Sequence, residues 1–202
     1  MEMKSINERF NHLVKVISSE RFLNNKILCN DVPFFIANYP IKDEQEMSKV
    51  GNQLINKLRA EYGIEVVKIN VYDLAVEILK SNKGDWDWYI ENESNTPKQI
   101  LNSELQGILS AKDVLVPAIL KKIDEKPDAK VIFITGVGAV YPYIRTHNIL
   151  VNLEKFVREK PLVLFYPGEY QIVENYGTTY SLFGVIQEER DYRARNIFEI
   201  SL

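Results

Sequence analysis

The sequence predicts an α/β fold with a mostly parallel central sheet and helices on both faces. Four short apolar runs carry this prediction, and amphipathic stretches with helical spacing separate them along the chain. The four runs are residues 32–37, 64–70, 130–135 and 162–166. Short, continuously apolar strands that alternate with helices are typical of βαβ crossovers, because both faces of a parallel sheet are covered.

The helices are predicted from caps and from apolar periodicity. Ser5 and Glu8 have the spacing of a capping box, and Gly63 follows the apolar stripe of 43–62 at the position that ends a helix. The other predicted helices are 72–80, three near 85–92, 97–110 and 112–125, and one that includes Ile149, Leu150, Leu153, Phe156 and Val157. The predicted strand 162–166 ends at Pro167 and Gly168. The rest of the chain is less regular, with one candidate strand at 197–200.

Residues 84–93 combine both tryptophans with four acidic residues. Trp86, Tyr89 and Ile90 fall on one helical stripe, which favours packing into the core. The alternative is an acidic and aromatic docking surface, since tryptophan and tyrosine are enriched at interface hot spots.

Length and composition indicate one domain that spans residues 1–202. Hydrophobic residues make up 46% of the chain and charged residues 26%, so a core can form without a metal or disulfide. Cys29 is the single cysteine and is predicted to be a small buried residue. No apolar run is long enough for a membrane helix, which predicts a cytoplasmic protein. The formal net charge of -3 argues against direct DNA binding, although a local basic patch would still permit it.

A conventional ATP site is not expected, and no cofactor is predicted. The chain lacks the G-x-x-x-x-G-K-[ST] pattern, and residues 38–42 after the first predicted strand contain no glycine. Gly136 and Gly138 form half of a dinucleotide fingerprint, but its third glycine would fall at the bulky Tyr141. Two interpretations stay open: a tight turn at the carboxyl end of a strand, or a ligand-binding turn.

Arg145 and His147 follow this turn and are the candidate polar groups beside it. They lie two residues apart, so on a regular helix they would point in different directions. Arg145 stands close to two tyrosines and could bind a carboxylate or phosphate, or pair with an acidic residue. No orienting acid lies near His147 in the sequence, which favours a satisfied histidine at the start of a helix over a general base. The chain also has no HExxH, no GxSxG and no Cys/His cluster.

From residue 130 onward the chain resembles a known family. The ordered motifs are Thr135-Gly-Val-Gly138, Pro142-Tyr-Ile-Arg145-Thr-His147-Asn148, Phe165-Tyr-Pro-Gly168-Glu-Tyr170, Leu182-Phe-Gly184 and Tyr192-Arg-Ala194. This set resembles the BrxB family, which is encoded in bacterial BREX phage-defence systems. The resemblance implies a role in antiviral defence beside other BREX components, which include a DNA methyltransferase, a large ATPase and PglZ, a protein of the alkaline-phosphatase superfamily. It implies no catalytic mechanism. One departure is Arg195, where the resemblance leads us to expect an aromatic residue.

These observations predict a non-enzymatic assembly or adaptor subunit, shaped like a P-loop NTPase but without the Walker A motif. Its predicted partners are other BREX proteins, with PglZ first. Tyr170, Tyr192 and Arg193 are candidate contact residues, because aromatics and arginines contribute most at interfaces. The alternative is a degenerate nucleotide- or phosphate-binding sensor or enzyme that uses the 136–147 turn. A third hypothesis, a DNA-contacting adaptor that uses the arginines near 190–195, is disfavoured by the acidic balance.

Overall fold

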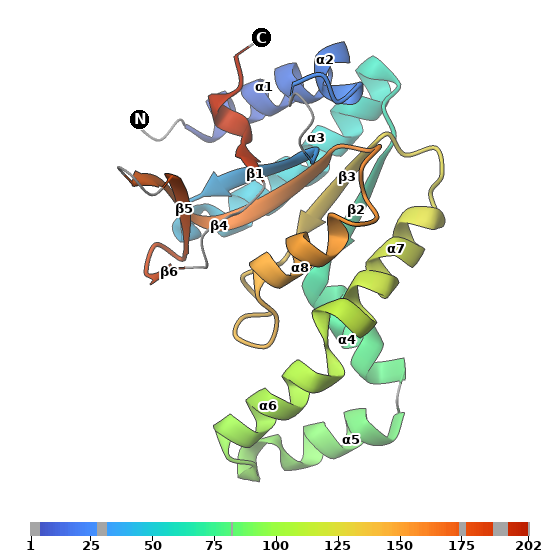
Figure 1. The fold of residues 1–202 in the computed structure, drawn as a ribbon, viewed down its shortest axis with the longest axis vertical. Coiled ribbons are helices and arrows are strands. Elements are labelled where there is room, and N and C mark those ends of the chain that lie inside the picture. Colours follow the sequence, from blue (N-terminus) through green and yellow to red (C-terminus); the bar gives the residue numbers. More distant parts are fainter. Residues whose placement is uncertain (1–4, 28–31, 82, 174–176, 188–193, 202) are drawn as a thin grey trace.

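A computed structural model of the 202-residue chain describes residues 5–27, 32–81, 83–173, 177–187 and 194–201. Within these residues a seven-stranded sheet contains a path in the order β2-β3-β4-β1-β7, and β5 and β6 extend it from β4 (Figure 1). The strands are β1 Phe34–Tyr39, β2 Val66–Asn70, β3 Val131–Thr135, β4 Leu162–Val173, β5 Gly177–Leu182, β6 Ile186–Gln187 and β7 Arg195–Asn196. The α-helices are α1 Ile6–Ile17, α2 Glu20–Leu23, α3 Glu44–Tyr62, α4 Val71–Ser81, α5 Lys83–Asn92, α6 Lys98–Ile108, α7 Val116–Asp124 and α8 Thr146–Leu153.

The main path of the sheet is parallel throughout. β1 pairs with both β4 and β7, β2 pairs with β3, and β3 pairs with β4, all in parallel register. Only the extension through β4, β5 and β6 is antiparallel. The predicted α/β fold with a mostly parallel sheet is therefore confirmed. Three predicted strands match β1, β2 and β3 with small shifts at their ends, and the fourth matches the start of β4.

Each face of the sheet is covered by its own layer of helices. Side chains alternate between the faces, as strand geometry requires. Along β3, Val131 and Phe133 pack with residues of α1 and α3, whereas Ile132 and Ile134 pack with residues of α4, α7 and α8. All four of these side chains are fully buried, so β3 lies at the centre of both cores.

The predicted caps of two helices are present. Ser5 accepts a hydrogen bond from the backbone N–H of Glu8, whose carboxylate accepts one from the backbone N–H of Ser5. Gly63 ends α3 with a φ of 63°, in the left-handed conformation that glycine adopts without strain.

Two predictions about the C-terminal third are wrong. β4 does not end at Pro167 and Gly168 but continues to Val173, because from Gly168 onward it pairs with β5 instead of β1. Ile197–Glu199 form a 3₁₀ helix, and the last strand is the two-residue β7 that precedes it.

Helices α5 and α6 form an arm that extends away from the sheet (Figure 1). The prediction that Trp86, Tyr89 and Ile90 pack into the sheet core is wrong. Ile90 is 62% exposed, the Lys80 ammonium lies 5.0 Å from the ring centroid of Trp86, and the Tyr89 hydroxyl lies 3.3 Å from the Glu104 carboxylate. The predicted burial of Cys29 concerns a residue outside the described ones.

Candidate functional site

The predicted turn lies at the carboxyl end of β3, where open parallel sheets usually bind ligands. Gly136 has a φ of 78° and passes so close to Asn70 that a Cβ atom would overlap the Asn70 amide oxygen. That oxygen accepts hydrogen bonds from the backbone N–H groups of Tyr72 and Asp73 and so caps α4. Gly136 therefore allows the turn to pack against the start of α4.

Gly138 allows a second close approach. A Cβ atom there would lie 2.8 Å from Pro167 Cγ and 2.9 Å from Phe183 Cε1. The Tyr141 ring also packs edge-on against the Phe183 ring, with centroids 6.4 Å apart. Packing alone thus accounts for both glycines as parts of a tight turn, and a ligand-binding role for them stays a prediction.

The structure separates Arg145 from His147. Arg145 is exposed at the N-cap of α8, 6.0 Å from the centroid of the Tyr141 ring, whereas His147 is half-buried in the first turn of that helix. Arg145 contributes to a small cavity of about 170 Å³, which His147 does not line. The cavity is lined by Gln106, Leu109, Ala111, Tyr143, Ile144, Arg145 and Asn148.

A buried polar network near the end of β1 was missed by the sequence analysis. Arg9 is only 4% exposed, and its guanidinium donates to the carbonyl oxygen of Asn38. The Asn38 amide donates to the Gly168 carbonyl oxygen at 3.4 Å, and the Asn196 amide donates to the Asn38 side-chain oxygen at 3.1 Å. Burial lowers the pKa of Arg9, and the nearby carboxylate of Asp43 partly opposes this shift. The sequence does contain one signal of this network: Arg9 is a charged residue on the otherwise apolar face of α1.

Tyr170 belongs to the same end of the sheet. Its hydroxyl donates to the Glu199 carboxylate at 2.9 Å, so the side chain links β4 to the C-terminal 3₁₀ helix. Burial, together with the hydrogen bond to Glu199, raises the pKa of Tyr170 to about 12. The other two candidate contact residues, Tyr192 and Arg193, lie outside the described residues.

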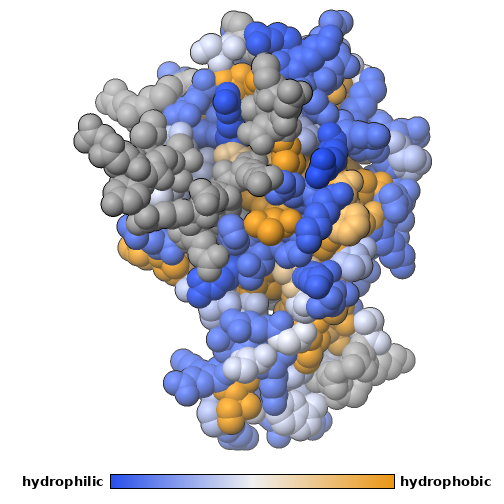
Figure 2. Space-filling model, in the orientation of Figure 1, coloured by the Kyte–Doolittle hydropathy of each residue, from blue (hydrophilic) through white to orange (hydrophobic). Residues whose placement is uncertain are grey.

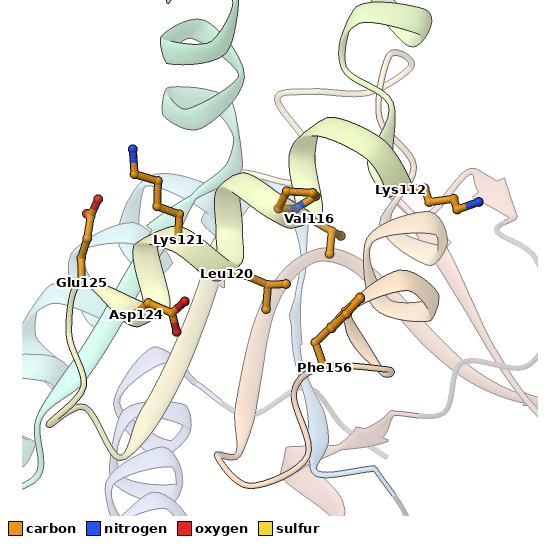
Figure 3. A pocket seen from close by; sticks show the side chains of 8 residues that line it. Lys112, Val116, Leu120, Lys121, Asp124, Glu125 and Phe156 are labelled. Atoms are coloured by element: carbon orange, nitrogen blue, oxygen red, sulfur yellow. The ribbon is translucent and has the colours of Figure 1, made fainter.

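An apolar groove runs along α7 on the outside of the helical layer (Figure 3). Its volume is about 620 Å³, within the range of pockets that bind organic ligands or side chains of a partner. Phe156 forms one wall and is 64% exposed. The prediction that places Phe156 in a helix is wrong, because α8 ends at Leu153. The groove is lined by Lys112, Val116, Pro117, Leu120, Lys121, Asp124, Glu125 and Phe156.

Neither a metal cluster nor a membrane span is found in the described ranges. Among these residues, no three His, Cys, Asp or Glu side chains come together in a way that could hold a metal ion. No helix within them combines the length and apolar character needed to cross a membrane.

The fold and these sites define an α/β protein whose turn at the end of β3 is closed by packing and whose surface carries an open apolar groove. The chain belongs to the BrxB family: the family model described as BREX protein BrxB matches residues 67–197. A BREX protein BrxB from Bacillus cereus (strain H3081.97) is 32% identical over 200 residues, which cover 98% of this chain and 100% of that relative. Another from Escherichia coli O9:H4 (strain HS) is 27% identical over 162 residues, or 80% and 78% of the two chains. No solved structure matches.

Proposed function

We propose that this protein is a non-enzymatic assembly subunit of a BREX defence system and acts by binding other BREX components. Family membership supports the defence role, since both relatives are named as BREX proteins. The observation that carries the binding role is the open groove on α7, with an aromatic ring 64% exposed in its wall. The groove lining combines apolar side chains with charged ones, as protein interfaces do.

PglZ is the first partner we propose, because the resemblance to the BrxB family implies a role in the same defence system. Three residues from the last third of the chain are the proposed contacts, and Tyr170 is the one that the structure describes. It is half-buried and already hydrogen-bonded to Glu199. Tyr170 can therefore present one edge of its ring to a partner while its hydroxyl holds the C-terminal segment in place.

The test is co-purification from cells that carry the complete defence locus, followed by pairwise co-expression with PglZ. We expect the tagged protein to co-elute with PglZ in size-exclusion chromatography. Tyr192→Ala and Arg193→Ala should weaken co-elution while the melting temperature is kept. Loss of both co-elution and stability would instead indicate core packing. The proposal fails if the wild-type protein co-elutes with no component of the system.

A second candidate function is a phosphate-binding sensor, favoured by the position of Arg145 beside a cavity at the carboxyl end of the sheet. The cavity volume of about 170 Å³ is small for a whole nucleotide, although a single phosphate group would fit. Calorimetry with ATP and magnesium separates the two functions. The assembly role predicts no measurable heat of binding, whereas micromolar affinity that Arg145→Ala abolishes would support the sensor.

A further inference from the structure

The walls of the groove on α7 are built almost entirely from side chains of two segments. Val116, Pro117 and Leu120 come from α7, and Phe156 comes from the chain that follows α8 (Figure 3). Leu120 and Phe156 face each other across the groove in this view. An exposed aromatic beside aliphatic side chains is the arrangement that protein partners use as an anchor pocket.

Charges of opposite sign lie at the two ends of the groove. Lys112 lies in the π-helical turn Ala111–Leu115 that precedes α7, and Asp124 and Glu125 lie where α7 ends. Within the part of the chain that the structure describes, none of these three side chains forms an ion pair. The adjacent Lys122 does form one, with Glu77 at 3.1 Å. Lys121 also lines the groove and lies beside Glu125 (Figure 3), so the end with the two carboxylates carries one positive charge as well and stays net negative. The groove therefore offers a positive end and a net negative end to an occupant.

The chemistry of the walls favours a helical occupant over an extended one. Most backbone groups of α7 are used within the helix, and the N–H groups of Phe156 and Val157 both donate to the Leu153 carbonyl oxygen, so an extended peptide would find few backbone partners there. A helix satisfies its own backbone and needs only an apolar face. From Lys112 to Glu125 the groove spans about 20 Å at the helical rise per residue, enough for three to four turns of a second helix.

We propose that the groove binds one amphipathic helix of a partner protein, antiparallel to α7, with an apolar side chain held between Leu120 and Phe156. Asp124 and Glu125 attract a basic side chain and the positive N-terminal end of the helix dipole, while Lys112 attracts an acidic side chain and the negative end. The attraction between side-chain charges and the attraction to the helix dipole both favour the antiparallel orientation. This inference rests on the proposed function, since it names a surface of the assembly subunit, in addition to the proposed contact at Tyr170, and the kind of partner segment that binds there.

The first test compares two exposed apolar residues in the co-purified complex. Phe156→Ala removes a ring that is 64% exposed, and the matched control Tyr62→Ala removes a ring that is 46% exposed at the end of α3. We expect Phe156→Ala to weaken binding of the BREX partner about tenfold or more, the effect of a hot-spot residue, and Tyr62→Ala to change it less than twofold. Both variants should keep the wild-type melting temperature.

The second test addresses orientation. A photo-crosslinking amino acid at Phe156 should react with one helix of the partner, and mass spectrometry should place basic residues toward the N-terminal end of that helix. Reversing the acidic end with Asp124→Lys and Glu125→Lys should weaken binding, and a matching reversal of those basic residues in the partner should restore it.

Several results would overturn the inference. Wild-type binding that Phe156→Ala leaves unchanged would remove the groove from the interface while the assembly role stands. Cross-links to a second copy of the chain would make the groove a dimer interface, and cross-links to an extended segment would contradict the helical occupant. A wild-type protein that binds no component would overturn both this inference and the proposed function.

Discussion

The sheet body buries its apolar side chains, whereas the α5–α6 arm leaves several of them exposed. In the body, the side chains of β3 from Val131 to Ile134 are all fully buried between two helical layers. On the arm, Trp88, Ile90 and Ile100 are 45%, 62% and 51% exposed. Apolar residues reach the surface of the narrower lower lobe in Figure 2, which is the arm in this orientation. The contrast indicates that stability comes from the body, and that the arm contributes little to the core.

The two regions also differ in charge. Residues 83–108, which span the arm, contain five acidic and two basic residues and so have a formal charge of -3. The whole chain has 28 acidic and 25 basic residues and the same net charge. The rest of the protein is therefore neutral overall. Two arms that met in solution would repel each other, so arm-to-arm contact between copies is disfavoured.

Hydrogen exchange should show the largest difference between the two regions. We expect amides of β3 to exchange only through global unfolding, whereas amides of α5 and α6 should exchange through local opening, about 100-fold faster or more. The physical reason is that β3 is buried on both faces while the arm has little core of its own. Equal protection of the arm and β3 would show that the arm unfolds together with the body.

Matched truncations should show the next largest difference. Phe133→Ala removes a fully buried ring that packs edge-on against Phe165, with centroids 5.2 Å apart. We expect it to lower the free energy of unfolding by about 3–5 kcal/mol. Ile90→Ala on the arm should change it by less than about 0.5 kcal/mol. Urea denaturation measures both, and a large loss for Ile90→Ala would mean that the arm has a hidden structural role.

Replacement of a glycine by alanine should change the free energy of unfolding in opposite directions in the two regions. Gly136→Ala in the body imposes a Cβ at a φ of 78° and against the Asn70 amide, which should cost about 1–3 kcal/mol. Gly107→Ala in α6 meets no atom within 4 Å and should stabilise the protein by up to about 1 kcal/mol, because alanine favours the helix. Thermal unfolding of the two variants checks the signs.

The smallest expected effect is a pH dependence at the edge of the body. Tyr170 has a pKa of about 12, raised chiefly by burial and further by Glu199, against about 10 in the unfolded chain. The stability that Tyr170 contributes is therefore complete below about pH 10. Between about pH 10 and pH 12 its hydroxyl ionises in the unfolded chain but stays protonated in the folded protein, so this stability is lost. Glu199→Gln should lower the pKa of Tyr170 only in part, because burial remains. Ultraviolet titration, with Tyr170→Phe to assign the signal, measures this shift.

Part of the candidate site was predictable from local sequence. The location of Gly136, Gly138 and Arg145 at the end of a strand follows from an apolar run that stops at Thr135. The groove was not predictable. Phe156 stands at helical spacing from Leu153, but α8 ends at Leu153, and this leaves the ring outside the helix and exposed.

The sequence by itself determined which segments become the parallel strands β1 to β3, where β4 begins, and most of the helices, because apolar periodicity and caps act over a few neighbouring residues. Only the tertiary structure decided the strand order, the continuation of β4 past Pro167 and the burial of Arg9. Each of these depends on a partner far along the chain: β5 pairs with β4, and the Asn38 carbonyl accepts from Arg9. The separation of the arm from the body has the same cause, since whether a helical stripe is buried depends on the surface that it meets.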